Sequence, residues 1–305
     1  MQRRQRLLRH FAREIIPLVA LIGSCRTLPA PERVASASVS QGIAAVNGTT
    51  LWYEAAGQGA PVVLLHGGNL DHRMWDDQFA RFAQSHRVVR YDARGFGRSG
   101  RADKPFAAHE DLFALLHHLG ISRASLVGLS LGGRIAVDFT LAHPEMVDRL
   151  VLAGPGLSGW AWAPDSPDTL WNQDARGALA RHDTVGVALA WLRSDYMRPA
   201  MEQPALAARL RTLAAENVGS WKDAFRHGDV ESVVVPPAVS RLATLRASTL
   251  VIVGSRDVPD IQRIVDTLVA TVPAARKLVV HGAGHMVNME QPARFTAEVL
   301  AFLSR

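Results

Sequence analysis

Residues 128–133 read GLSLGG, with an apolar run before them and a helical pattern after them. This order predicts a strand, a tight turn and a helix. A serine at the apex of such a turn takes a strained backbone conformation, which requires small residues two positions before and after it, and Gly128 and Gly132 stand there. The turn would lift the Ser130 hydroxyl clear of the sheet, and the helix that begins at Leu131 would place unpaired N–H groups beside it. Negative charge that developed there would be stabilised, so Ser130 is a candidate nucleophile.

The composition indicates one large globular domain. With 305 residues, of which 48% are hydrophobic and 20% charged, the chain can bury a sizeable core. The formal net charge is +6, but five arginines and one glutamate before Cys25 supply +4 of it. The rest of the chain is close to neutral and has no basic stripe with interleaved aromatic residues. We therefore predict that nucleic acid is not a partner.

The amino terminus, residues 1–25, reads as a secretion signal. An arginine-rich head precedes an apolar run, 15–23, that is too short for a permanent membrane span. The run ends at Cys25, the sole cysteine, in a pattern that resembles the bacterial lipoprotein box, where the cysteine is lipidated and becomes the mature N-terminus. We predict secretion across the inner membrane with membrane anchoring through Cys25; the alternatives are an unlipidated signal and a cytoplasmic protein with its start codon assigned too far upstream. Residues 26–40, rich in Pro, Ala and Ser, are predicted to be a tether.

The remaining chain alternates between strand and helix patterns. Asn47-Gly48 suits a two-residue hairpin turn, so an antiparallel pair opens the domain. Continuous apolar runs follow, as expected of strands that are covered on both faces, and amphipathic helices separate them. We predict an α/β fold with a doubly wound, mostly parallel sheet and a core at 41–153 and 249–305. The predicted strands after the hairpin are 61–65, 86–91, 124–127, 148–153, 249–253 and 277–280, and the helices are 74–83, one that contains Leu112 to Leu119, 134–142, 261–270 and 292–303.

Residues 154–248, called the insertion below, do not fit this alternation. They contain helical segments such as 178–192 and 203–216 and follow one predicted strand directly. We predict a helical cap over the carboxyl ends of the strands, where open α/β sheets place their ligands. Its tryptophans would either line an apolar pocket above the serine or pack the cap's own small core. Five of the seven tryptophans belong to it: Trp160, Trp162, Trp171, Trp191 and Trp221.

A serine nucleophile needs a base within reach and a buried carboxylate that orients the base. The predicted strand 249–253 runs into Asp257, and the strand 277–280 runs into His285. Both residues therefore follow the carboxyl end of a strand, at the same sheet edge as the serine turn. We predict Ser130 as nucleophile, His285 as base and then acid, and Asp257 as the partner of the histidine.

Other side chains compete for these roles. His281 also follows the last strand, but glycines around His285 give that ring the freer approach to Ser130. Asp92 follows a strand yet precedes the serine, and it suits a structural carboxylate that accepts backbone N–H groups. Asp260 suits the N-cap of the next helix. Among the other histidines, His66 and His143 are predicted to be structural. No spacing among His109, His117 and His118 suggests a metal site.

Acyl transfer also needs donors for the oxyanion that develops in the transition state. The N–H group of Leu131, directly after the nucleophile, is one predicted donor. The second comes from the HGG stretch at 66–68, where small residues let the backbone approach closely. We predict that it is the N–H group of Gly68.

From about Ile43 to its end, the chain resembles the α/β-hydrolase fold superfamily. The resemblance rests on five stretches: HGG at 66–68, YDARGFGRS at 91–99, GLSLG at 128–132, GSRD at 254–257 and GH at 284–285. Together they imply the α/β-hydrolase fold and a serine triad, and they are much less specific for the substrate.

Within this superfamily, residues 71–75 and 87–92 are similar to 3-oxoadipate enol-lactonases and to cofactor-free haloperoxidase-like esterases. Haloalkane dehalogenases and epoxide hydrolases carry an aspartate at the position of Ser130, which argues against both. Carbon–carbon bond hydrolases of aromatic degradation usually carry Asn before the serine and a longer glycine run, and Leu129 and Asn69 depart from that pattern.

These observations predict a serine hydrolase that cleaves small-molecule carboxylic esters or lactones through an acyl-enzyme on Ser130, with no cofactor and no metal ion. Two classes of alternative remain open. One is an enol-lactonase or a carbon–carbon bond hydrolase of aromatic degradation. The other is a binding protein on the same fold that holds a ligand without turnover.

Overall fold

The computed structural model describes residues 38–164, 166–219, 223 and 230–305. The predicted signal segment 1–25, with Cys25, lies outside the described residues, as do most of the predicted tether and Trp221. Among the residues that are described, no helix is both long and apolar enough to cross a membrane.

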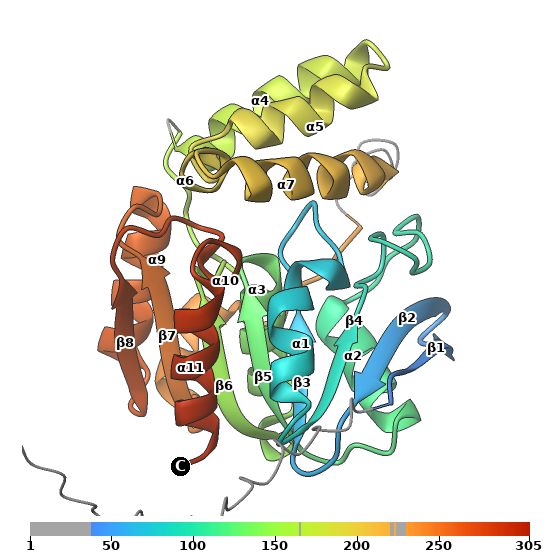
Figure 1. Ribbon diagram of the computed structural model, residues 1–305, viewed down its shortest axis with the longest axis vertical. Helices are drawn as coiled ribbons and strands as arrows, with labels where there is room; N and C mark the ends of the chain where they lie inside the picture. Colours follow the sequence, from blue (N-terminus) through green and yellow to red (C-terminus); the bar gives the residue numbers. More distant parts are fainter. Residues whose placement is uncertain (1–37, 165, 220–222, 224–229) are drawn as a thin grey trace, which may run out of the picture. The chain divides into compact units, whose positions relative to one another are not determined.

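One sheet of eight strands organises the fold, in the order β1-β2-β4-β3-β5-β6-β7-β8 (Figure 1). β1 pairs antiparallel with β2 and β2 antiparallel with β4, while every later pairing is parallel. The predicted doubly wound, mostly parallel sheet is therefore confirmed. Its strands are β1 (Ser40–Val46), β2 (Thr49–Ala56), β3 (Pro61–Leu65), β4 (Arg87–Tyr91), β5 (Ala124–Leu129), β6 (Val147–Ala153), β7 (Ser248–Gly254) and β8 (Ala275–Val280).

The opening hairpin follows from its turn dipeptide. Asn47 and Gly48 both have positive φ angles, 47° and 71°, and Val46 faces Thr49 across the turn. Two left-handed residues match the twist of the strands on either side, which is why this dipeptide favours a two-residue hairpin. The predicted antiparallel pair is confirmed, and it begins at Ser40, the last residue of the predicted tether.

Helices cover both faces of the sheet. In Figure 1, α1 and α11 lie side by side in front of it, while α2 and α3, which contact each other, lie behind it. Leu112, Leu115 and Leu116 are fully buried, as the spacing of the leucines predicts for the core-facing stripe of α2. The helices of this part are α1 (Asp76–Phe82), α2 (Ala108–His118), α3 (Leu131–Ala142), α9 (Pro259–Thr271), α10 (Val287–Glu290) and α11 (Pro292–Leu303), with the 3-10 turns η1 (His72–Trp75) and η2 (Pro144–Met146).

Two helix starts differ from the sequence prediction. The predicted helix 74–83 begins instead as the 3-10 turn η1, because the Asp71 side chain accepts a hydrogen bond of 3.0 Å from the Arg73 N–H and caps the turn. The prediction of Asp260 as an N-cap is wrong. Val258 is the N-cap of α9, and Asp260 lies in the first turn, where its carboxylate pairs with Arg263.

Between β6 and β7 the described residues form α4 (Pro167–Ala180), α5 (Thr184–Arg193), α6 (Arg198–Met201) and α7 (Pro204–Glu216), followed by the 3-10 turns η3 (Ala238–Ser240) and η4 (Leu242–Thr244). In Figure 1 these helices lie above the carboxyl ends of the parallel strands. The single helix predicted over 178–192 is wrong. The chain breaks at His182, whose φ is +56°, and the Asp183 side chain starts α5 by accepting from the Gly186 N–H at 2.7 Å.

Candidate active site

The serine turn has the strained geometry that its glycines predict. Ser130 lies between β5 and α3 with φ 54° and ψ −113°, a region that L-residues rarely occupy. A Cβ atom on Gly132 would overlap the Leu65 carbonyl oxygen, and one on Gly128 would overlap the Gly132 carbonyl oxygen. Only glycine fits either position, so the turn can close and the serine stands at its apex.

Backbone hydrogen bonds hold Ser130 in place. Its N–H donates to the carbonyl oxygen of Ala153, the last residue of β6, at 3.0 Å, and its carbonyl oxygen accepts from the Gly156 N–H at 2.9 Å. The apex of the turn is therefore fixed by the strand next to it and by the first residues of the insertion.

Asp257 and His285 form a buried pair. His285 Nδ1 lies 3.0 Å from both carboxylate oxygens of Asp257. His285 is 3% exposed and Asp257 is 8% exposed. Because an ionised carboxylate can only accept, the proton lies on Nδ1 and leaves Nε2 free to accept a proton. The pair thus has the chemistry of a base and the group that orients it.

The acid and histidine loops touch along their backbones. The Arg256 N–H donates to the Ala283 carbonyl oxygen at 2.8 Å, and a Cβ atom on Gly254 would overlap the carbonyl oxygens of Ala283 and Gly284. Glycine at the end of β7 therefore lets the two loops meet, which brings Asp257 to His285.

A close approach that the sequence does not predict occurs at Gly154, where the chain leaves β6. Its φ is +46°, and a Cβ atom there would lie 2.9 Å from Asp257 Oδ2 and 3.1 Å from His285 Nδ1. Gly154 is thus both a bend and the residue that leaves room for the Asp–His pair. The sequence signals the bend through GPG at 154–156, but the room depends on two loops more than 100 residues away.

The two predicted oxyanion donors lie together. Gly68 and Leu131 line the same pocket as Ser130, and a Cβ atom on Gly68 would stand 4.0 Å from Leu131 Cβ. Leu131 is the first residue of α3, so its N–H has no acceptor within the helix. The arrangement can present two N–H groups to one oxygen beside the serine.

The competing residues have other partners. His281 is exposed and is not among the residues that line the serine pocket. Asp92 accepts from the His72 N–H and ring at 2.8 and 2.7 Å and from the Arg98 N–H at 2.9 Å, the structural role predicted for it.

The two histidines predicted to be structural also have local partners. Both ring nitrogens of His66 are engaged with backbone groups, and burial lowers the pKa of this histidine, which keeps it neutral. His143 stacks on Phe113 and contacts Glu110 at 3.2 Å.

A pocket of about 340 Å³ opens above the serine. Its wall combines the serine turn, the histidine loop and three tryptophans of the insertion, of which Trp171 and Trp191 are largely buried. Of the two interpretations of the tryptophans, the pocket wall holds for these three, while Trp160 is not among the lining residues. The lining residues are Gly68, Asn69, Phe96, Ser130, Leu131, Arg134, Gly156, Leu157, Trp162, Trp171, Asn172, Trp191, Tyr196, Ile261, His285 and Met286.

Few charges reach this pocket. The guanidinium of Arg134 lies 2.7 Å from Glu231 and 3.6 Å from Asp138, so two carboxylates compensate its charge. Asn69, with φ +62°, is 6% exposed, and its side-chain oxygen has no hydrogen-bond partner among the described residues. The pocket is therefore mostly apolar, with a carboxamide near its oxyanion side.

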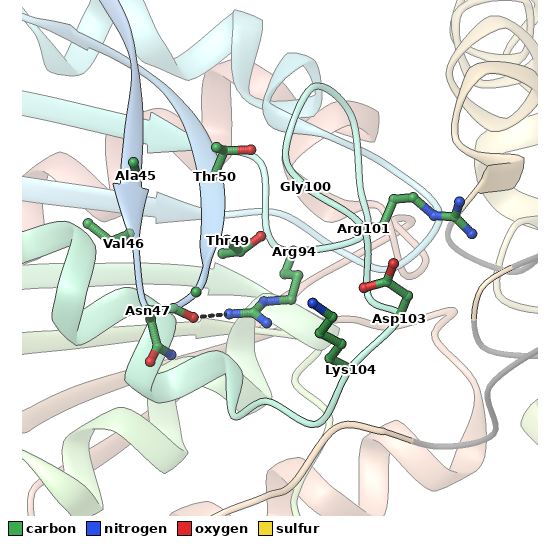
Figure 2. Close-up of a pocket in the computed structure, with 11 residues that line it drawn as sticks. Ala45, Val46, Asn47, Thr49, Thr50, Arg94, Gly100, Arg101, Asp103 and Lys104 are labelled. Carbon is green, nitrogen blue, oxygen red and sulfur yellow. Dashed lines mark hydrogen bonds between the residues drawn. The ribbon is translucent and has the colours of Figure 1, made fainter.

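A larger hollow, about 640 Å³, lies between the β1–β2 turn and the loop before α2 (Figure 2). Arg94 on its floor donates to Asp111 at 2.7 and 2.9 Å and to the Asn47 carbonyl oxygen at 2.7 Å. Arg101 at its rim pairs with Asp223. Both arginines thus have acidic partners, and the predicted site residues that the structure describes all lie elsewhere.

Three other buried groups lie close enough to hold a metal ion: Asp71, His72 and Asp92. Protein donors already occupy their oxygens, however. Asp71 accepts from Arg73 at 2.9 and 2.6 Å and from the Asn217 side chain at 2.8 Å, and Asp92 accepts from His72. We therefore assign this cluster a structural role.

Comparison with known proteins agrees with this geometry. The model of the alpha/beta hydrolase family matches residues 62–299. Rhodomycin D methylesterase DauP from Streptomyces sp. (strain C5) is 30% identical over 296 residues, covering 83% of this chain and 94% of the relative.

Two solved structures resemble this chain over nearly their whole length. A hydrolase from Pseudomonas aeruginosa PA01 is 28% identical with a TM-score of 0.72, covering 87% of this chain and 99% of that one. The enol-lactonase from Burkholderia xenovorans LB400 is 27% identical with a TM-score of 0.70, covering 87% and 100%.

Proposed function

This chain belongs to the alpha/beta hydrolase family and is an esterase-like hydrolase, and we propose that it cleaves uncharged carboxylic esters or lactones through an acyl-enzyme on Ser130. The observation that carries the proposal is the buried Asp257–His285 pair, because His285 lines the same pocket as the strained serine. A serine with such a partner pair needs only a carbonyl group in the pocket to react.

In the proposed mechanism, His285 Nε2 accepts the Ser130 proton as the serine oxygen attacks the substrate carbonyl. The N–H groups of Leu131 and Gly68 stabilise the oxyanion. The imidazolium, held by Asp257, then protonates the leaving alkoxide, and the acyl group stays on Ser130. Water, deprotonated by the same histidine, attacks the acyl-enzyme and releases the acid.

The lining of the pocket favours substrates that are uncharged and apolar on the acyl side. Trp162, Trp171 and Trp191 supply apolar surface, and the one arginine in the wall is paired with two acids. Each methylene that the wall buries should add up to ~0.8 kcal/mol, or roughly fourfold in kcat/KM. We expect p-nitrophenyl butyrate and hexanoate to react faster than the acetate, and anionic lactones to react slowly.

A fluorophosphonate probe tests the nucleophile. We expect it to label the wild type and not Ser130→Ala, with both proteins folded by circular dichroism. Failure to label the folded wild type would contradict the acyl-enzyme route and favour a binding protein on this fold.

An enol-lactonase, which acts on anionic lactones, is the second candidate, favoured by the likeness to a solved enol-lactonase that this chain covers over its whole length. Measuring kcat/KM for the p-nitrophenyl ester series beside a panel of neutral and anionic lactones separates the two. Preference for acetate or for an anionic lactone would contradict the apolar acyl pocket and support the lactonase.

For location, we propose secretion across the inner membrane with Cys25 as a lipid anchor. The proposal rests on the pattern of residues 1–25 alone, which lie outside the described residues. In a bacterial host, the full-length protein should partition with membranes, and Cys25→Ser should release it or leave it uncleaved. A cytoplasmic product that still begins at Met1 would contradict the proposal.

A further inference from the structure

The histidine loop has a second acidic neighbour that the mechanism above does not use. Glu290, the last residue of α10, is 7% exposed, and its carboxylate faces back toward the loop. One carboxylate oxygen accepts from the Gly284 N–H at 2.7 Å and the other from the Met286 N–H at 3.0 Å. These two N–H groups stand on either side of His285.

We propose that Glu290 is a positioning residue for the base: by binding the N–H groups before and after His285, it holds the backbone from which the imidazole projects. This assignment rests on the proposed function of His285. Asp257 holds the ring through Nδ1, and Glu290 holds the main chain, so the two carboxylates restrain different parts of one residue.

Burying a carboxylate costs free energy unless hydrogen bonds compensate its lost hydration. A buried glutamate at this position therefore indicates a specific role. Burial raises the pKa of Glu290, although both backbone N–H groups favour the charged form. No lysine or arginine forms an ion pair with Glu290 among the described residues; its hydrogen bonds go to the histidine loop. An apolar side chain would fill the space without holding those N–H groups.

The helix that carries Glu290 is itself anchored. The Asn288 side chain donates to the Met74 carbonyl oxygen at 3.0 Å, and the Gln78 side chain donates to the Asn288 carbonyl oxygen at 3.0 Å. A Cβ atom on Gly284 would lie 2.5 Å from Pro199 of α6, so the insertion also packs against the loop. The loop thus contacts both an anchored helix and the insertion, and a small displacement of its backbone would move the imidazole.

The charge of Glu290, like its hydrogen bonds, supports His285 as the base. The charged groups that face it are His285, Asp257 and Arg256, and the Tyr196 ring packs edge-on against His285 with centroids 4.7 Å apart. When His285 takes the serine proton, the imidazolium gains from both nearby carboxylates, whereas Arg256 opposes it. Removing the charge of Glu290 should therefore make protonation of the base less favourable.

Two variants separate geometry from charge. Glu290→Gln removes the charge and presents an amide NH₂ to one of the two N–H groups, whereas Glu290→Asp keeps the charge but shortens the reach by one methylene. Glu298→Gln, on α11, is the matched control. Each is compared with the wild type and Ser130→Ala by circular dichroism and by kcat and KM for p-nitrophenyl butyrate from pH 4 to 9.

For Glu290→Gln we expect kcat lower on the order of 10- to 100-fold, because the base is misplaced, with KM within about twofold. We also expect the acid limb of kcat/KM to move to lower pH, by about half a unit or more, because an anion beside the base is lost. Glu290→Asp should lower kcat and leave the acid limb in place, and Glu298→Gln should match the wild type. A purely structural role would lower the melting temperature without moving the acid limb.

Failure of the proposed function and failure of the Glu290 assignment would give different results. Equal rates for the wild type and Ser130→Ala would overturn the proposed function, and this assignment with it. Wild-type kcat and an unmoved acid limb in folded Glu290→Gln, beside an inactive Ser130→Ala, would overturn the assignment of Glu290 alone. If Glu290→Gln does not fold, Glu290→Asp decides by its kcat; if neither folds, Glu290 is a structural residue and the assignment is wrong.

Discussion

The proposed reacting groups and the insertion above them are held by different kinds of contact. Ser130, Asp257 and His285 follow the carboxyl ends of β5, β7 and β8, where backbones approach so closely that Gly132 and Gly254 tolerate no side chain. The insertion is also joined to the rest of the fold by polar side chains, several of them exposed, such as Arg256 with Glu202 at 2.7 Å. Backbone contacts fix the proposed reacting groups, whereas side-chain pairs help to hold the insertion that lines the pocket. Changes in the first region should remove activity, and changes in the second should shift stability.

The largest effect should come from Asp257→Asn. The uncharged amide of asparagine does not stabilise the imidazolium. Its NH₂ group can donate to Nδ1, which puts the ring proton on Nε2, so that Nε2 cannot accept the serine proton while the surroundings stay packed. We expect kcat to fall on the order of 10⁴-fold with little change in the far-ultraviolet circular dichroism spectrum. Activity close to that of the wild type would place the acid elsewhere.

Next is Gly154→Ala, at the boundary between the two regions. Alanine at φ +46° is strained, and its Cβ atom would stand 2.9 Å from Asp257 Oδ2. We expect kcat on the order of 10- to 100-fold lower, because the Asp–His pair must shift. The control is Gly120→Ala, where alanine is also strained, at φ +65°, but its Cβ atom would have no neighbour within 4 Å. Equal kcat values for the two variants would show that the space beside the pair is not limiting.

The same difference in contacts decides which residues of the site the sequence could predict. The serine turn depends on glycines two residues away, and Asp257 and His285 follow strand ends, so local patterns locate all three. Gly154 could be recognised only as a bend, since the atoms it must avoid come from loops far along the chain. Contacts of that kind have no local signature.

The helices of the insertion and the end of the chain illustrate two other limits. Helix-forming residues lie on both sides of His182, so one helix was predicted where a left-handed residue and the Asp183 cap divide two. The four-residue helix that carries Glu290 is too short to show a period. Its carboxylate acts on N–H groups at most six residues away, yet only the fold of the loop brings them within reach.

A smaller effect is expected where the insertion joins the sheet through Asn217, at the end of α7. Its side chain donates to Asp71 at 2.8 Å and accepts from the Gly97 N–H at 2.9 Å, and it is 3% exposed. Asn217→Ala removes both hydrogen bonds, one of them to the buried carboxylate of Asp71, and should cost about 1–3 kcal/mol in the free energy of unfolding. The exposed Arg209–Asp77 pair provides the contrast, because Arg209→Ala should cost less than about 1 kcal/mol. Urea unfolding of both variants measures the difference, and equal losses would contradict the special role of Asn217.

The smallest effect is expected in the free energy of unfolding at acid pH. It tests whether the contact between Asn217 and Asp71 weakens before the sheet unfolds. Burial alone would raise the pKa of Asp71, but hydrogen bonds from Arg73 and Asn217 outweigh it and hold the pKa well below its usual range. A carboxyl with a depressed pKa contributes stability above its unfolded-state value, near 3.9, and that stability is lost as the pH falls through the folded-state value. Between pH 6 and pH 3, the wild type should therefore lose more free energy of unfolding than Asp71→Asn, by on the order of 1 kcal/mol. Asp266→Asn, at an exposed pair with Lys277, is the control and should follow the wild type. Parallel losses in the wild type and Asp71→Asn would show that this junction does not contribute to the acid sensitivity of the protein.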